Sequence, residues 1–370
     1  MIYLDYNATT PVDKEVAEAM IPYLYGHFGN PSSSHFLGQE AKLGIEQGRT
    51  QVANFLNCAP GEVLFTSGGS ESNNTVIKGV AQTYRHKGNH MIVSAVEHPA
   101  VIKPCQYLEQ LGYTITYVPV DSYGMVQVDD VKKQLTDQTI LVSIMHSNNE
   151  TGTIQPIKEI AEACHERGVL VHTDASQSAG KVVLDVAELG VDFLTLAGHK
   201  LYAPKGIGAL YIREGIHIEP LIHGAGHENG RRAGTENTPY IIGLGKACEL
   251  ASDSTSRARV KEVADYFYDR LQEAFGDKIH LNGHRDKRLP NTLNVSFLGA
   301  VGHEVIASLE DVAASTGSAC HSGETLISPV LKAMNVSPSI GQGAVRFSVG
   351  RYTTMAEIDE VIGKLKEYLL

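Results

Sequence analysis

The sequence is short of positive charge, and this shortage argues against one class of partner. It has 31 lysine and arginine residues against 42 aspartate and glutamate residues, which gives a formal net charge of −11. Proteins that bind nucleic acids gather lysine and arginine along the phosphate backbone, so nucleic acid is not expected as a partner. The sequence also lacks any apolar run of roughly 18 residues, the length that a membrane-spanning helix needs. We therefore expect no membrane segment.

Signs of export are missing as well. The N-terminus, MIYLDYNATTP, has neither the basic segment nor the apolar core of a signal peptide. The five cysteines are odd in number and their spacing suggests no pairing, whereas exported proteins often use a disulfide framework. We therefore expect a reducing compartment and a cytoplasmic protein. The cysteines are Cys58, Cys105, Cys164, Cys248 and Cys320.

What is present is the composition of an ordinary globular enzyme, with 42% hydrophobic and 20% charged residues. The 370 residues suffice for one large domain and a smaller one. Between residues 62 and 212, continuous apolar segments alternate with helical patterns, which indicates a mainly parallel sheet covered on both faces. We expect an α/β fold with a seven-stranded sheet. Its predicted strands are residues 63–66, 91–95, 114–118, 140–145, 169–173, 193–196 and 209–212.

The remainder of the chain predicts a smaller α+β domain. A long helical stretch at residues 247–275 leads into it, followed by strands near 292–297 and 344–349 and helices near 301–309, 328–334 and 356–369. The N-terminal arm is expected to pack with this part. The predicted boundaries are residues 13–254 for the large domain, and residues 1–12 together with 255–370 for the small domain.

Two apolar runs, residues 169–173 and 191–196, carry the strongest indication of chemistry. The segment between them is long enough for a crossover, so the two strands can be parallel neighbours in one sheet. Asp174 follows the first strand and Lys200 follows the second, which brings both to one sheet edge. A lysine forms a Schiff base with a carbonyl, and pyridoxal phosphate (PLP) needs such a lysine and an acid for its ring nitrogen.

Other predicted strands end in polar groups that suit the same cofactor. SGGSESNN (residues 67–74) opens a helix, where Gly68 and Gly69 allow an anion to approach free backbone N–H groups. This stretch matches neither the Walker P-loop nor GxGxxG, which argues against nucleotide and NAD binding. His98 and the run HSNNE at residues 146–150 follow two further strands, whereas Gln177 and His199 follow the same strands as Asp174 and Lys200. In open α/β sheets ligands bind at these carboxyl ends, so the set predicts a PLP site.

A metal site is the competing use for so many histidines. His223 and His227 have a spacing that a helix would bring together. However, Gly224 and Gly226 make a helix improbable there, and no suitable Cys or Asp lies nearby in sequence. No metal is expected.

Cys320 differs from the other cysteines because it lies in a stretch of small residues, STGSACHSG at 315–323, rather than among apolar neighbours. An accessible thiol of this kind is how a nucleophilic cysteine is presented. His321 follows it directly and is positioned in sequence to influence its ionisation.

These motifs together resemble the PLP-dependent cysteine desulfurases of the iron–sulfur-cluster and nitrogen-fixation type. That family shares the aspartate aminotransferase-like fold (fold type I) of the class V aminotransferases, and selenocysteine lyases are close relatives. The resemblance extends over essentially the whole chain. It rests on LDYNATTP, GNPSS, FTSGGSESNN, VEH, SNNETGTIQP, HTDASQSAGK, GHKLYAPKG, RRAGTEN, GSACHSG and RFSVGR.

The resemblance implies a role for each matched residue. Lys200 would hold PLP and return a proton, His98 would stack on its ring and assist proton transfer, and Cys320 would take the substrate sulfur as a persulfide. Asp174 would pair with the pyridine nitrogen and Gln177 with the phenolic oxygen. The remaining assignments are Gly69, Ser70 and His199 with PLP phosphate, Thr235 with the phosphate of the partner subunit in a homodimer, and Asn149, Arg346 and Asn30 with the substrate.

The implied reaction converts L-cysteine to L-alanine and passes sulfur to an acceptor or scaffold protein in cluster assembly. Two positions depart from the family pattern. Ala197 replaces a serine that many members use as a phosphate contact, and His321 replaces a frequent threonine, as in selenocysteine lyases. A selenocysteine lyase is therefore the alternative, and an inactive assembly scaffold is an alternative of another class.

Overall fold

The structure is a computed structural model that describes residues 1–316 and 327–370. Its centre is a seven-stranded sheet in the order β2-β8-β7-β6-β5-β3-β4. Neighbouring strands are parallel except at β8, which is antiparallel to both β2 and β7. The predicted mainly parallel sheet is therefore confirmed. Its strands are β2 (Val63–Thr66), β3 (His90–Ser94), β4 (Thr114–Val118), β5 (Thr139–Ser143), β6 (Leu170–Asp174), β7 (Phe193–Ala197) and β8 (Gly208–Ile212).

Helices cover both faces of this sheet because the strands carry apolar side chains on both sides. One hydrophobic cluster joins Phe193 of the sheet to Ile77 on α3 and Val101 on α4. The opposite cluster joins Val171 to Ile160 on α6, and it also includes residues of α1, α2, α7 and α8. These helices are α1 (Lys14–Tyr25), α2 (Phe36–Leu56), α3 (Gly69–Tyr84), α4 (Pro99–Gln110), α5 (Val128–Gln134), α6 (Ile157–His165), α7 (Val186–Leu189) and α8 (Thr238–Ala251).

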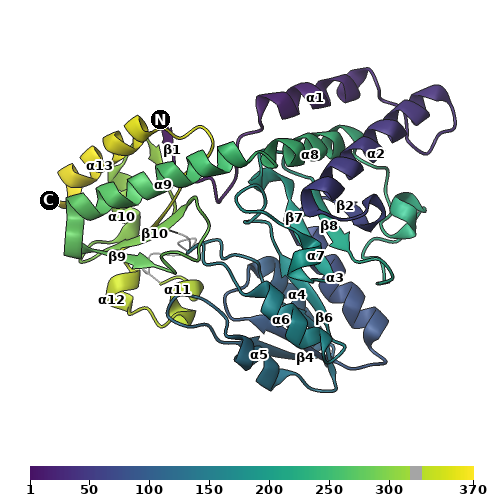
Figure 1. The fold of residues 1–370 in the computed structure, drawn as a ribbon, viewed down its shortest axis with the longest axis horizontal. Coiled ribbons are helices and arrows are strands. Elements are labelled where there is room, and N and C mark those ends of the chain that lie inside the picture. The colour runs from purple at the N-terminus through teal and green to yellow at the C-terminus, as the bar shows by residue number, and fades with distance from the viewer. Residues whose placement is uncertain (317–326) are drawn as a thin grey trace.

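A second, separate core lies in the part of the molecule that holds both chain ends (Figure 1). It brings Leu4 of the N-terminal arm together with Phe267 and Phe347. The antiparallel sheet β12-β10-β9 and the parallel pair β1-β11 belong to this region, as does the packing of α9 on α13. Its elements are β1 (Ile2–Tyr3), α9 (Ser254–Phe275), β9 (Ile279–Asn282), β10 (Thr292–Phe297), α10 (Gly302–Ser308), β11 (Val312–Ala313), α12 (Pro338–Gly341), β12 (Ala344–Ser348) and α13 (Met355–Leu369). The short helix α11 (Pro329–Ala333) instead contributes Val330 and Leu331 to the core of the large sheet.

The pairing of β1 with β11 confirms that the N-terminal arm packs with the C-terminal region. The division into domains at residues 12–13 and 254–255 stays a prediction. In the described residues, no helix combines the length and apolar character needed to cross a membrane.

One predicted helix differs from the structure. The helical stretch predicted at residues 247–275 is two helices, α8 and α9, separated at Ser252 and Asp253. Asp253 accepts hydrogen bonds from the N–H groups of Thr255 and Ser256. A side chain that caps a helix start in this way defines a new helix, and this cap overrides the apolar spacing that continues across the break.

Candidate active site

A cavity of about 190 Å³ opens at the carboxyl ends of the parallel strands. We call it the strand-end cavity. The register of β6 and β7 places Asp174 opposite Thr195, so Lys200, which follows β7, emerges beside Asp174 as predicted. The residues that line the cavity are Gly69, Ser70, Asn73, His98, Ala100, Met145, Ser147, Asn149, Asp174, Ser176, Gln177, Ala197, His199 and Lys200.

The amino group of Lys200 is held by the N-terminal arm. Its Nζ atom donates to the backbone oxygens of Asn7 at 2.6 Å and Ala8 at 2.8 Å. Burial and then Arg346 lower the pKa of Lys200 to about 8, against a smaller opposing effect of Asp174. A lysine with such a pKa supplies a useful fraction of neutral, nucleophilic amine near neutral pH.

Asp174 presents a fixed carboxylate to the cavity. Its Oδ2 atom accepts a hydrogen bond of 2.7 Å from Asn73 Nδ2, and its Oδ1 atom accepts one of 2.9 Å from the N–H of Ser176. The residue is buried at the end of β6. These two donors hold the carboxylate in one orientation and make it suitable for pairing with a protonated ring nitrogen.

The two histidines of the cavity differ in their surroundings. His98 caps α4, because its Nδ1 atom accepts a hydrogen bond from the N–H of Ala100 at 3.1 Å. The proton of its neutral ring therefore lies on Nε2. Burial lowers the pKa of His98, and burial together with the nearby Lys200 lowers the pKa of His199 to about 4. Both rings are consequently neutral at physiological pH.

The start of α3 forms an anion cradle beside these groups. Gly68 precedes the helix at a φ of 145°, a value that favours glycine. A Cβ atom on Gly69 would lie 3.0 Å from Ser176 Oγ and 3.4 Å from the Cβ atom of Ala197, so the backbone is closely approached there. The Ser176 hydroxyl is buried and has no hydrogen-bond partner in the described part of the chain. A phosphate at this helix start would find N–H groups and a spare hydroxyl.

Gln177 and Lys181 connect the cavity to the N-terminal arm. The Nε2 atom of Gln177 donates to the backbone oxygen of Asn7 at 2.9 Å, and its Oε1 atom accepts from Lys181 Nζ at 2.9 Å. Lys181 also donates to Asn7 Oδ1 at 3.2 Å. These contacts orient the Gln177 amide, with Nε2 toward the backbone of Asn7 and Oε1 toward Lys181.

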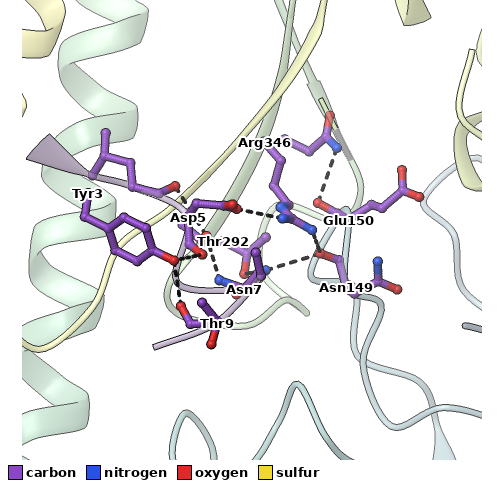
Figure 2. Close-up of polar contacts among 12 residues, drawn as sticks. Tyr3, Asp5, Asn7, Thr9, Asn149, Glu150, Thr292 and Arg346 are labelled. Atoms are coloured by element: carbon purple, nitrogen blue, oxygen red, sulfur yellow. Dashed lines mark hydrogen bonds and ion pairs between the residues drawn. The ribbon is translucent and has the colours of Figure 1, made fainter. Parts of the chain in front are cut away.

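Arg346 lies next to the cavity through its contact with Asn149, as Figure 2 shows. Its Nη1 atom donates to the backbone oxygen of Asn149 at 2.9 Å, and its Nη2 atom donates to Asp5 Oδ1 at 2.7 Å. Asn7 Nδ2 reaches the same Asn149 oxygen at 3.3 Å. Arg346 and Asn149, both predicted to bind substrate, are thus brought together.

Among the described residues, two of those predicted for the site are not brought to the cavity. Asn30 and Thr235 lie exposed in loops, and neither lines the cavity. Cys320 lies outside the described residues, as does His321. The roles assigned to them therefore stay predictions. His223 and His227 do not share partners, since His223 contacts Glu219 and His227 accepts from the N–H of Gly234.

Several residues of the site were not singled out from the sequence. Asn73 and Ser176 lie inside motifs that were recognised, SGGSESNN and HTDASQSAGK, but no role was assigned to them. Asp5 and Asn7 lie in the N-terminal motif LDYNATTP, within the arm that was expected to pack with the small domain. The signal available for all four was a polar residue within a family motif.

Comparison with known proteins agrees with this geometry. The sequence matches the family described as class-V aminotransferase over residues 2–361. It is 49% identical to cysteine desulfurase IscS of Dictyoglomus turgidum, over 100% of this chain and 94% of the relative. It is 47% identical to cysteine desulfurase IscS of Methanosarcina thermophila, over 99% of this chain and 91% of the relative.

Solved structures give the same answer. A NifS-like protein superposes with a TM-score of 0.93 at 38% identity, covering 100% of this chain and 99% of that chain. A structure titled SspA in complex with cysteine has a TM-score of 0.86 at 37% identity, covering 96% and 100%. The fold, the cavity and these relatives together show that the chain belongs to the class-V aminotransferase family, among the proteins named cysteine desulfurases.

Proposed function

We propose that this chain is a PLP-dependent cysteine desulfurase that converts L-cysteine to L-alanine and keeps the sulfur as a persulfide on Cys320. The observation that carries the proposal is the meeting of Lys200, Asp174 and the start of α3 in one cavity. The relatives named cysteine desulfurase and the neighbour whose title includes cysteine support the choice of substrate.

The residues of the strand-end cavity fit PLP. A lysine amine for the aldehyde, a carboxylate for the ring nitrogen and a helix start for the phosphate all face the same space. Bound PLP supplies an electron sink that weakens bonds at the substrate carbons. Its expected holders are Gly69, Ser70, His98, Asn149, Asp174, Ser176, Gln177, His199 and Lys200, with Thr235 from the partner subunit.

The chain's own groups divide the remaining work. We propose that Arg346 and Asn149 hold the substrate carboxylate and that Lys200 and the Nε2–H of His98 move protons. Asn30 is the further substrate contact that the resemblance implies. Neutral His98 suits an assisting role because Nδ1 already accepts from the N–H of Ala100, which leaves Nε2–H to donate a hydrogen bond to the group that gains or loses the proton.

The sulfur step needs a thiolate. The Cys320 sulfur attacks the substrate sulfur, an S–S bond forms and the substrate C–S bond breaks. The electron pair of that bond stays with the substrate carbon, which takes up a proton and leaves as alanine. The other cysteines are unsuited, because burial raises the pKa of Cys58, Cys105 and Cys164 to about 12 and that of Cys248 still further.

The direct test uses the PLP-loaded enzyme and two variants, Cys320→Ser and Cys58→Ser. Wild type and Cys58→Ser should release alanine from cysteine and gain a sulfur atom in intact mass when no reductant is present. Cys320→Ser should do neither and keep the absorbance of bound PLP. Alanine release from cysteine by Cys320→Ser at the wild-type rate would contradict the persulfide role.

Selenocysteine lyase activity is the second candidate, favoured by His321 directly after Cys320. Selenium leaves carbon more readily than sulfur, so such an enzyme depends less on a nucleophilic thiol. Parallel assays with L-cysteine and L-selenocysteine separate the candidates. Alanine from selenocysteine alone, with no persulfide from cysteine, would favour the lyase.

Two further proposals concern the setting of the enzyme. We propose that it works in the cytoplasm, where thiols and persulfides are kept from oxidation. We also propose that it passes its sulfur to an acceptor or scaffold protein in iron–sulfur cluster assembly.

A further inference from the structure

Arg346 lies on strand β12, whose neighbours fix its backbone on two sides. On one side it pairs with Asn294 of β10. On the other its N–H donates to the oxygen of Ser315 at 2.6 Å, and its oxygen accepts from the N–H of Ser315 at 3.2 Å. The backbone position of Arg346 is thus set by the sheet, whereas the direction of its long side chain depends on what the guanidinium contacts.

The N-terminal arm is attached to the same strand two residues further on. The N–H of Ser348 donates to the oxygen of Leu4 at 2.7 Å, and its hydroxyl accepts from the N–H of Asn7 at 2.9 Å. Alternate residues of a strand face the same side, so Ser348 and Arg346 project together. Asp5 is one of the two arm residues between these attachments, and it is thereby placed to reach along the strand to Arg346.

Asp5 is braced before it makes that contact. The Tyr3 hydroxyl lies 3.0 Å from the backbone oxygen of Asp5 and 2.8 Å from that of Thr9, which closes the turn between them (Figure 2). From this fixed backbone the Asp5 carboxylate accepts from Arg346 Nη2. The side chain of Arg346 is only 7% exposed and that of Asp5 20%, so solvent screens this ion pair little.

The contacts that Arg346 makes with residues 1–316 and 327–370 leave part of its guanidinium available. One N–H of Nη2 goes to Asp5 and one of Nη1 goes to the backbone oxygen of Asn149, which is fewer donors than a guanidinium carries. The Nε–H group is buried and has no partner among the described residues. Such an orphaned donor costs free energy unless a ligand satisfies it.

We propose that Asp5 is a positioning residue for substrate binding, which holds the Arg346 guanidinium in the orientation that receives the substrate carboxylate. This inference rests on the proposed function, in which Arg346 binds that carboxylate. Asp5 and Asn149 would fix two corners of the guanidinium and leave the remaining N–H groups for a second anion.

A rival role for Asp5 is competition, in which its carboxylate occupies Arg346 and must be displaced by the substrate. The two roles predict opposite results. Removing a competitor strengthens cysteine binding, whereas removing a positioning group weakens it. The geometry favours positioning, because Asp5 engages one corner of the guanidinium and the Nε–H has no partner in the described part of the chain.

The test compares Asp5→Ala with Asp5→Asn in the PLP-loaded enzyme. Asparagine keeps an oxygen that can accept from Nη2, and alanine does not. We expect Asp5→Ala to raise KM for L-cysteine about tenfold, equivalent to about 1.4 kcal/mol, with kcat within about twofold of wild type. Asp5→Asn should restore KM to within about threefold of wild type, because the hydrogen bond orients the guanidinium.

Cysteamine supplies the readout that a general structural defect would not give, since it has the amine and thiol of cysteine without the carboxylate. Its inhibition constant should be the same in wild type, Asp5→Ala and Asp5→Asn. Asp13→Ala and Asp13→Asn are the matched controls. Like Asp5, Asp13 connects the N-terminal region to an arginine near β12. Its Oδ2 atom lies 3.1 Å from Arg351 Nη1, and its side chain is 13% exposed. These controls should leave KM for cysteine unchanged.

Each outcome decides something. A lower KM in both Asp5 variants would overturn positioning in favour of competition, and an unchanged KM in Asp5→Ala would overturn any role for Asp5 in binding. Equal losses for cysteine and cysteamine would also overturn the proposal, because the carboxylate would not be involved. Failure of wild type to make alanine from cysteine would instead overturn the proposed function. If Asp5→Ala does not fold, a KM in Asp5→Asn below that of wild type still decides for competition.

Discussion

The amino group of Lys200 is held between charges of both signs, and its reactivity should show this in its dependence on pH. Burial and Arg346 lower its pKa, while Asp174 and Asp5 raise it, with a net value of about 8. Lys181 faces the same region, and burial and Lys200 lower its own pKa well below the usual value. The neutral amine that attacks an aldehyde therefore becomes the main form of Lys200 above about pH 8.

This leads to a prediction for cofactor uptake. The initial rate at which PLP-free protein recovers its bound-PLP absorbance should rise between about pH 6.5 and pH 8.5 and then level off. An ordinary lysine would keep gaining rate up to about pH 10. Lys200→Arg is the control and should show no such absorbance at any pH. A rate that is flat across this range would contradict the assigned pKa.

Ser176 is the candidate replacement for the phosphate contact that is missing at Ala197. Its buried hydroxyl has no partner in the described residues and lies beside the position that a Cβ of Gly69 would take. Ser176→Ala should weaken PLP retention about tenfold, measured as the dissociation constant from fluorescence or dialysis, in line with about 1.5 kcal/mol for a hydrogen bond to a charged group.

A second substitution makes this prediction sharper. Ala197→Ser in the Ser176→Ala background should recover much of the lost PLP affinity, because it returns a hydroxyl to the same cradle. Ser67→Ala, at an exposed position before the helix, serves as the control and should bind PLP like wild type. No loss in Ser176→Ala would mean that its hydroxyl faces something other than phosphate.

The residues of the cavity were predictable from sequence to different degrees. Asp174 and Lys200 were found because each follows an apolar strand, and strand ends meet at one edge of a parallel sheet. Asn73 and Asp5 were not, because their importance depends on partners far away in the chain, Asp174 and Arg346. Neither hydrophobic periodicity nor secondary-structure propensity indicates hydrogen bonds between residues so far apart in sequence.

At the scale of elements, Glu97 joins the turns that follow β3 and β5. Its Oε1 atom accepts from Ser94 Oγ at 2.5 Å and from the N–H of Met145 at 2.8 Å. Burial raises the pKa of Glu97 to about 8. Met145 and the neighbouring His98 both line the cavity, so this carboxyl group helps to hold two parts of the cavity wall together.

The raised pKa makes a prediction about stability. A carboxyl group whose pKa is higher in the folded than in the unfolded state stabilises the fold fully below its unfolded pKa, about 4.3. That stabilisation is lost as pH rises through about 8. The melting temperature of wild type should therefore fall further between pH 5 and pH 8.5 than that of Glu97→Gln, whose amide does not titrate. The difference between the two decreases should be roughly 4 °C or more.

Thermal unfolding of the two proteins at both pH values is the measurement. Glu18→Gln, at an exposed position of α1, is the control, and its melting temperature should fall by as much as that of wild type between the two pH values. If Glu97→Gln is as sensitive to pH as wild type, the carboxyl group is ionised in the folded protein and other groups dominate.

The elements themselves were largely predictable, and the exceptions have identifiable causes. All seven strands of the large sheet were expected, because buried parallel strands are continuous apolar runs. Strands β1 and β11 have two residues each, too few for an alternation to be visible. They are defined by their pairing with each other, which is information of long range.

At the scale of the whole molecule, exposed apolar side chains collect on α1, α2 and the loop between them. Leu24 and Phe28 are 56% and 68% exposed, and Phe36 and Leu43 are 69% and 71% exposed. Large apolar side chains exposed in this number on neighbouring elements are typical of a site of association. We propose that it is covered in a homodimer.

The dimer prediction has a catalytic part, because Thr235 is exposed in its own chain and is expected to complete the phosphate site of the partner subunit. A Thr235→Ala chain keeps Lys200, and a Lys200→Ala chain keeps Thr235. Neither homodimer then has a complete site, but a mixed dimer has one. Unfolding and refolding the two variants together with PLP should therefore restore alanine formation that neither variant shows at the same low PLP concentration.

Sedimentation measures the assembly independently of activity. Wild type should sediment as a dimer at micromolar concentration, whereas Phe28→Asp combined with Leu24→Asp should shift toward monomer, because burying two carboxylates in an apolar interface is costly. Val183→Asp places a carboxylate at a residue that is 71% exposed and belongs to neither α1, α2 nor the loop between them, so it should remain a dimer. If the double variant stays dimeric, the dimer interface lies elsewhere on the molecule. If the mixed Thr235→Ala and Lys200→Ala chains form dimers without regaining activity, the active sites are not shared between subunits.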